Sequence, residues 1–253
     1  MVLFDLGRYD DARQRAGEAL AHDPANHAAH TLMARTLYEL DEHRSALDAA
    51  TASLALQETP RAHHIAALIE RARQEHASSL RHLDRAIDLE PEWFLPHTSA
   101  GLTLVNRAAT EDGPDRAASL DEARVHATHG RDLAPQTPLA HYALAVVEQT
   151  SGDLVAAADH GTRCVELDPE WTDAHLLMAR IRWAQGMHRL ASRHLSSAGS
   201  HDRGGGRALE LLKRLNRGLV GRFGRRRGAT SSELVPEARR ILEVDRDLRG
   251  GAS

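Results

Sequence analysis

Histidine is the residue type in this chain with the widest chemical reach. There are seventeen histidines, against a single cysteine, Cys164. Imidazole binds transition metals and exchanges protons near neutral pH. Two pairs spaced by three residues, His27 with His30 and His126 with His129, would each share one helix face. No zinc motif of the His-Glu-x-x-His type accompanies either pair, so we predict no metal site and no cofactor.

The motifs of catalysis are also missing from the sequence. It contains no Gly-x-Ser-x-Gly elbow of the kind that presents a nucleophilic serine. It has no glycine loop that follows a strand and would hold a phosphate; Gly204–Gly206 has the composition of a linker. The sequence therefore predicts a protein that is not an enzyme.

The histidines instead follow a repeat. Four prolines, Pro24, Pro91, Pro135 and Pro169, each close an alanine-rich stretch, and Glu58 occupies the matching place between the first two. A histidine follows each proline after six residues, at His30, His97, His141 and His175, and His63 and His64 occupy this place in the third unit. A spacing near thirty-four residues predicts stacked helix pairs, and the longer step from Pro91 to Pro135 predicts an insertion in one pair. We expect the histidines to pack as rings between the helices.

Small residues recur at fixed distances before each closing position. They predict that two antiparallel helices approach closely in every unit, and they include Ala12, Ala46, Ser79, Ala123 and Ala157. Residues 8–199 should be almost entirely helical, because no run alternates as a β-strand does. Turns are expected near residues 24, 41, 58, 74, 91, 112, 135, 152, 169 and 186. The insertion should lengthen the helices and the loop Thr110–Pro114 of its pair.

These features resemble the tetratricopeptide repeat family. The matching segments are Gly7–Ala12 through Ala19-Leu20 to Asp23-Pro24, and Ala140-His141 through Gly152 and Ala157 to Pro169. The resemblance implies an all-α, right-handed α-solenoid of stacked antiparallel helix pairs over residues 1–200, made of a partial first unit and five pairs. It also implies a protein-interaction scaffold that binds a protein or peptide segment in a concave groove.

In that family the first helix of each pair lines the groove. Carrying the groove positions onto this chain, at fixed distances after the repeated histidine, predicts a set of partner-binding residues. Those of types enriched at binding hot spots, or able to bind a peptide backbone or carboxylate, are Arg35, Tyr38, Arg71, Asn106, Tyr142, Gln149, Arg180 and Trp183. The lysine and asparagine set by which chaperone-binding members hold a terminal carboxylate is not present, since the single lysine, Lys213, lies beyond the repeats.

The C-terminal part differs from the repeats in composition. Residues 201–206 read as a glycine-rich linker, 207–228 as a basic amphipathic helix, and 229–253 as a short helix and tail. Residues 202–228 carry nine basic and two acidic side chains, although the net charge of the chain is -4. Three roles stay open for Arg207–Arg227. The segment caps the last repeat, binds an anionic membrane surface as part of a peripheral adaptor, or contacts an acidic partner, nucleic acid or the chain's own acidic repeats, with nucleic acid not expected as a partner.

The rest of the sequence gives only broad expectations. No apolar run approaches a membrane span, no secretory signal opens the chain, and one cysteine cannot form an intrachain disulfide. We therefore expect a cytoplasmic protein. Residues Met1–Leu6 read as the end of a first helix, which predicts either further chain upstream or a partner or second copy that covers this end of the array.

Overall fold

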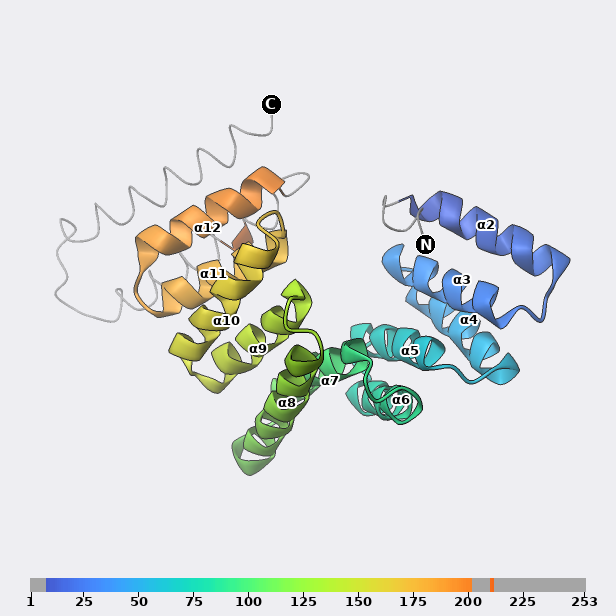
Figure 1. Ribbon diagram of the computed structural model, residues 1–253, viewed down its shortest axis with the longest axis horizontal. Coiled ribbons are helices and arrows are strands. Elements are labelled where there is room, and N and C mark those ends of the chain that lie inside the picture. Colours follow the sequence, from blue (N-terminus) through green and yellow to red (C-terminus); the bar gives the residue numbers. More distant parts are fainter. Residues whose placement is uncertain (1–7, 202–209, 212–253) are drawn as a thin grey trace. The chain divides into compact units, whose positions relative to one another are not determined.

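The structure, a computed structural model, describes residues 8–201 and 210–211. All its secondary structure in that part of the chain is helical, and no strand occurs there (Figure 1). The helices run in order as α2 (Tyr9–His22), α3 (His27–Glu39), α4 (His43–Leu56), α5 (Pro60–Ala72), α6 (His76–Leu89), α7 (Phe94–Ala108), α8 (Gly113–Leu133), α9 (Pro138–Ser151), α10 (Leu154–Leu167), α11 (Thr172–Ala184) and α12 (His188–His201). The predicted linker and C-terminal helices lie outside the described residues except for Glu210 and Leu211, and so do residues 1–7.

The helices form two compact units, which divide between Ala134 and Pro135. In unit 1, α3 packs on α4, α5 on α6 and α7 on α8, while α2 packs on α3. In unit 2, α9 packs on α10 and α11 on α12. Each helix from α2 to α11 ends near one of the predicted turns, so the all-α repeat of helix pairs is confirmed.

Local sequence explains where the helices begin and how the pairs turn. The side chain of Asn26 accepts a hydrogen bond from the backbone N–H of Ala29 at 3.0 Å, and Thr59 accepts one from Ala62 at 3.2 Å. Gly152 ends α9 with a φ of 95°, a conformation that suits glycine. In the two pairs that lack a turn glycine, Asp41 and Gln74 adopt φ values of 64° and 66° and keep the same turn at some conformational cost.

Small side chains allow the two helices of a pair to touch. Ala34, Ala46, Ala67 and Ala100 are completely buried. Where α7 crosses α8, a Cβ added to Gly101 would lie 3.1 Å from the Cβ of Ala127. The core is therefore built from backbone contact and methyl groups, with Ile69, Leu83 and Leu177 packed between neighbouring pairs.

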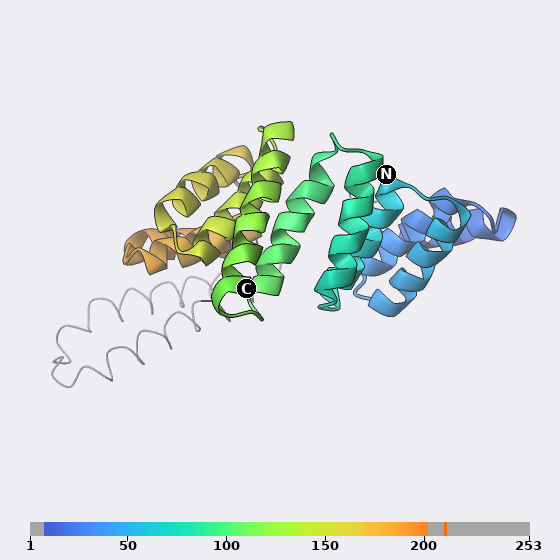
Figure 2. The same cartoon turned by 90° about the horizontal axis from the view of Figure 1, so that it is seen from below.

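The predicted insertion leaves its helix pair intact. It falls mainly in α8, which has 21 residues, against 15 in α7 (Figure 2). The predicted loop is shorter than expected, because Gly113 and Pro114 already belong to the first turn of α8, where proline costs no hydrogen bond. Ala100 and Ala127 are both fully buried in this pair, as the close approach of the two helices requires.

The repeated histidine is more than a packing ring. Its Nε2 atom donates to the carbonyl oxygen of the proline six residues earlier, which is Pro24 for His30, Pro91 for His97, Pro135 for His141 and Pro169 for His175. These distances are 2.9–3.0 Å. The bond ties the first helix of a pair to the turn that precedes it. In the third unit, His63 Nε2 donates to the carboxylate of Glu58 at 3.0 Å instead.

Cys164 lies fully buried in α10. Burial, and then the charge of Asp168, raises the pKa of its thiol to about 12. The thiolate is the reactive form of cysteine, so this side chain behaves as a small apolar residue in the core.

The close approach of α7 and α8 predicts that Gly130→Ala destabilises the fold. The new Cβ would lie 3.1 Å from the backbone nitrogen of Thr98 and 3.3 Å from the carbonyl oxygen of Phe94. We expect a loss of about 1–3 kcal/mol in the free energy of unfolding, measured by urea denaturation. Gly17→Ala in α2 is the matched control. Its nearest neighbour is Met33 Cε at 3.9 Å, so this change should add up to about 1 kcal/mol. Equal effects of the two substitutions would contradict the packing described.

Candidate partner-binding groove

The eight predicted partner-binding residues all lie on first helices of pairs. Unit 1 carries Arg35 and Tyr38 on α3, Arg71 on α5 and Asn106 on α7, and unit 2 carries the other four. Arg35 and Asn106 are exposed, whereas Tyr38 and Arg71 are half-buried. Each unit therefore has its own part of the predicted surface, and unit 1 also has a pocket there.

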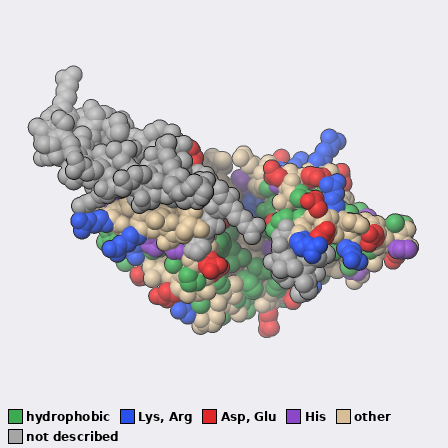
Figure 3. Space-filling view, turned by 90° about the horizontal axis from the view of Figure 1, so that it is seen from above, with side chains coloured by type: hydrophobic (Ala, Val, Ile, Leu, Met, Phe, Trp, Pro, Cys, Tyr) green, Lys and Arg blue, Asp and Glu red, His purple; other side chains and the backbone are tan. Residues whose placement is uncertain are grey.

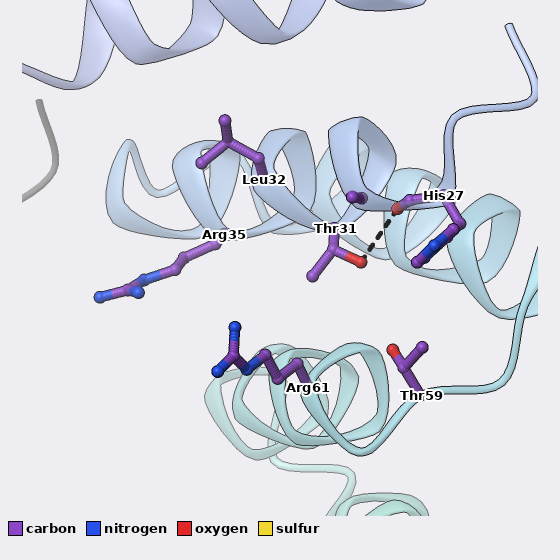
Figure 4. Close-up of a pocket in the computed structure, with 7 residues that line it drawn as sticks. His27, Thr31, Leu32, Arg35, Thr59 and Arg61 are labelled. Atoms are coloured by element: carbon purple, nitrogen blue, oxygen red, sulfur yellow. Dashed lines mark hydrogen bonds between the residues drawn. The ribbon is translucent and has the colours of Figure 1, made fainter. Parts of the chain in front are cut away.

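The pocket opens between α3 and α5. Its cavity of about 310 Å³ is at the lower end of the range of small-ligand sites. It is lined by His27, Ala28, Thr31, Leu32, Arg35, Thr59 and Arg61. Thr31 at its centre is held in place, because its hydroxyl donates to the carbonyl of His27 at 3.1 Å and lies 2.7 Å from the hydroxyl of Ser53 (Figure 4).

Two arginines mark one end of this pocket. Figure 4 shows the guanidinium groups of Arg35 and Arg61 on the same side of the view, with His27 and Thr59 toward the other side. Arg61 extends from α5 toward α3 in the same view. Arg61 makes no ion pair with any residue that the structure describes, so its donors remain available to a ligand.

Positive charge extends from the pocket along α5. The buried His64 donates to or accepts from the Ser99 hydroxyl at 2.9 Å and lies edge-on to the ring of Trp93. Burial, followed by the charges of Arg71 and Arg35, lowers the pKa of His64 to about 4. The positive charges of Arg35 on α3 and Arg71 on α5 therefore both disfavour the protonation of His64. Glu39 is an acidic residue that interacts with Arg35. Burial raises the pKa of its carboxyl group, and the positive charge of Arg35 lowers it by a smaller amount.

Several of the predicted residues also make contacts inside their own repeats. The ring of Tyr38 lies 5.8 Å from that of His43 across the turn, and Trp183 lies 4.6 Å from His188, edge to face. Arg71 occupies the equivalent place, and its charge helps to lower the pKa of His76 after burial and Arg107. These side chains therefore help to fix the turn between the two helices of a pair, in addition to any role in binding.

In unit 2 the aromatic residues dominate. Tyr142 on α9 stacks on Trp171 at 4.8 Å between ring centroids, which joins two successive repeats. Gln149 is half-buried near the end of α9, and its backbone carbonyl accepts a hydrogen bond from the backbone N–H of Gly152 at 3.3 Å. Arg180 on α11 is exposed. No group of three or more histidine, cysteine, aspartate or glutamate side chains suited to a metal ion occurs in the described part of the chain.

The pocket contains one of the eight predicted partner-binding residues, Arg35, together with Thr31, which also follows the repeated histidine at a groove position. Counting forward from the repeated histidine missed His27, Thr59 and Arg61, which precede it. Helical periodicity contained the signal for α3, because His27, Thr31 and Arg35 are spaced by four residues and share one face. Elsewhere acidic and basic side chains are interspersed over the visible surface (Figure 3).

Family comparisons agree with this architecture. A model described as the second ARM domain of tetratricopeptide repeat protein 21 matches residues 41–186, and a tetratricopeptide repeat model matches residues 3–69. The chain belongs to the tetratricopeptide repeat family. Similar curated proteins are tetratricopeptide repeat protein 21B of Xenopus laevis, 28% identical over 142 residues, and protein 21A of Mus musculus, 41% identical over 70 residues.

These matches cover 54% and 28% of this chain but only 11% and 5% of the relatives. The chain thus corresponds to a small part of each of those proteins.

Solved structures share the tetratricopeptide repeat fold. A thermophilic repeat protein of Thermus thermophilus has a TM-score of 0.68 at 15% identity, covering 77% of this chain and 99% of that chain. The Cut9 and Hcn1 hetero-tetramer of the APC/C gives 0.70 at 17% identity, covering 84% and 40%. Human IFIT1, solved as a dimer with m7Gppp-AAAA, gives 0.69 at 19% identity, covering 94% and 58%. At these identities the likeness establishes the fold alone.

The convergence of Arg35 and Arg71 on His64 can be tested by titration. Arg71→Ala removes a positive charge that disfavours imidazolium, so the pKa of His64 should rise from about 4 while staying below its ordinary 6.5, because burial remains. NMR of the imidazole ring against pH measures this shift. Arg44→Ala on α4 is the control and should leave the titration of His64 unchanged. An equal pKa of His64 in the Arg71→Ala and Arg44→Ala variants would contradict the placement of Arg71 near His64.

Proposed function

We propose that the chain is a protein-interaction scaffold that binds an extended protein or peptide segment across the first helices of unit 1. The pocket between α3 and α5 is the observation that carries this proposal. Members of this family bind protein partners in general. Support for the specific site comes from a cavity large enough for a few side chains and from arginines at its rim.

The side chains at the pocket favour a segment that carries carboxylates. Arg35 and Arg61 offer forked donors that match a carboxylate group, and Arg71 adds positive charge further along α5. Ala28, Leu32 and the methyl groups of Thr31 and Thr59 supply apolar contact beside them. A partner segment with an acidic residue next to an apolar one would fit these arginines and apolar side chains.

A peptide library tests this proposal. Random twelve-residue peptides displayed on phage are selected against the purified chain, and the enriched peptides are synthesised for fluorescence anisotropy. We expect acidic peptides whose Kd weakens about tenfold or more in the Arg35→Ala and Arg61→Ala double variant, because a hydrogen bond to a charged group contributes about 1.5–3 kcal/mol.

Arg15→Ala with Arg44→Ala is the matched control. These two exposed arginines lie on α2 and α4, outside the pocket, so their loss removes the same charge without touching it. Circular dichroism checks that both double variants keep the helical content of the parent. Equal weakening in the two variants would indicate general charge attraction, and undiminished binding in both would place the partner elsewhere, as on Arg180 or Trp183 of unit 2.

A second candidate function, that of a peripheral membrane adaptor, rests on the charge of the C-terminal segment. Arg207–Arg227 places basic residues opposite leucine, valine and phenylalanine in a helical pattern. No described helix combines the length and hydropathy that crossing a bilayer demands. The segment lies outside the described residues apart from Glu210 and Leu211, so membrane binding, like the cytoplasmic location, stays a prediction.

Liposome co-sedimentation separates the two candidates. If the adaptor function holds, the full chain should sediment with phosphatidylserine vesicles but not with phosphatidylcholine vesicles, and a chain ending at residue 203 should stay in solution. Added salt should release the bound protein, since exposed charges are screened over about 10 Å at 0.1 M ionic strength. Equal sedimentation of the two chains would exclude the segment as an anchor.

A further inference from the structure

Two helix pairs, one in each unit, contain imidazole rings that face each other. His63 on α5 and His82 on α6 bring their Nδ1 atoms to 2.9 Å. His175 on α11 and His194 on α12 bring theirs to 3.1 Å. Both pairs are spaced by nineteen residues, so they occupy the same place in their repeats, between the first and second helix.

Hydrogen-bond partners fix where the protons lie in these rings. His175 Nε2 faces the carbonyl oxygen of Pro169, and His63 Nε2 faces the carboxylate of Glu58, and both oxygens can only accept. Both rings therefore carry their hydrogen on Nε2, and in the neutral form their Nδ1 atoms are acceptors. His194 and His82 must then donate from Nδ1. Each pair is a single N–H···N hydrogen bond that joins two helices.

This bond restricts how many further protons a folded pair can hold. One extra proton can be added to the Nε2 of His82 or His194, which keeps the N–H···N bond, or to the Nδ1 of His63 or His175 if the partner ring moves its own hydrogen to Nε2. A second extra proton leaves two N–H groups facing each other at about 3 Å, with no acceptor and two positive charges. In the unfolded chain both rings are protonated independently.

We propose that these two histidine pairs, His63 with His82 and His175 with His194, are proton-sensitive joints that loosen their helix pairs in mild acid. Below the ordinary histidine pKa the unfolded chain binds more protons than the folded one. Stability therefore falls as pH decreases. The chain needs no ligand for this response, and it is independent of the partner proposed for unit 1.

Burial and the neighbouring positive charges also disfavour protonation of the donor rings. Burial, then His175 and Arg182, lowers the pKa of His194 to about 4. Burial, then His63 and Arg81, lowers the pKa of His82. Glu58 contacts His63 in one of the joints, and it is also bound by Arg85 at 2.6 Å and 2.9 Å. The contribution of the joints to the free energy of unfolding is therefore complete above pH 6.5 and is lost progressively as pH falls toward about 4.

In two other helix pairs, α7 with α8 and α9 with α10, histidine rings also contact each other at this place in the repeat. His97 lies 4.3 Å from His129 and 5.9 Å from His126, and His141 lies 5.8 Å from His160. Asp84 and Glu122 act on His126 with the opposite sign to burial and His129. These two pairs lack the Nδ1-to-Nδ1 hydrogen bond, so the proposal does not include them.

The test replaces the donor ring of each joint with a side chain that cannot be protonated. Glutamine can donate its amide N–H to the facing Nδ1, so the double variant His82→Gln with His194→Gln should keep the helices joined. We expect its thermal midpoint to match the parent at pH 7.5 and to fall less than the parent's when the pH is lowered to 5. His22→Gln, which changes an exposed histidine outside the joints, is the control and should follow the parent.

NMR of the parent chain provides a second measurement that does not depend on how well the variants fold. Ring nitrogen shifts should show hydrogen on Nε2 of His175 and on Nδ1 of His194 at neutral pH. His194 should remain neutral well below pH 6.5. A double variant as acid-sensitive as the parent, or an ordinary titration of His194, overturns the proposal.

Discussion

The close approach of two helices within each pair is the constraint on which the other features depend. Small side chains lie between α3 and α4, between α5 and α6 and between α7 and α8, and Ala34, Ala46, Ala67, Ser79, Ala123 and Ala127 among them are fully buried. A larger side chain at Gly101 or Ala127 would separate the helices. At this separation two imidazole rings span the gap from one helix to the other, and the first helices of neighbouring pairs lie close enough to form a pocket.

The fold could be predicted from the sequence because its determinants are local and repeated. Pro24 and its equivalents end second helices, small residues recur at constant offsets, and glycine at 152 and 186 marks two of the turns. The turn at Gln74 was predicted from the period alone, since a non-glycine residue adopts the left-handed conformation there. The turn near residue 112 was predicted, but the loop after α7 is shorter than expected, because Gly113 and Pro114 open α8.

The site could be predicted only in part, for a geometric reason. The phase of the repeat identifies which helix face lines the groove, and this led to Arg35 and Arg71. A pocket between α3 and α5 depends on which residues of two separate helices come opposite each other, and Arg61 reaches it from the first turn of α5. The periodic histidines show a similar limit. Their spacing indicated one shared environment, but the hydrogen bonds to proline carbonyls and to second-helix rings depend on three-dimensional contacts.

Photo-crosslinking at the pocket tests the central claim, that a partner segment lies across α3 and α5. A benzophenone amino acid is introduced at Ala28, which lines the pocket, and separately at Ala55, an exposed residue on the second helix α4. Both variants are irradiated with an acidic peptide selected on the intact chain. The account predicts a crosslinked peptide at position 28 and little or none at position 55. Crosslinking at position 55 without crosslinking at position 28 would contradict it.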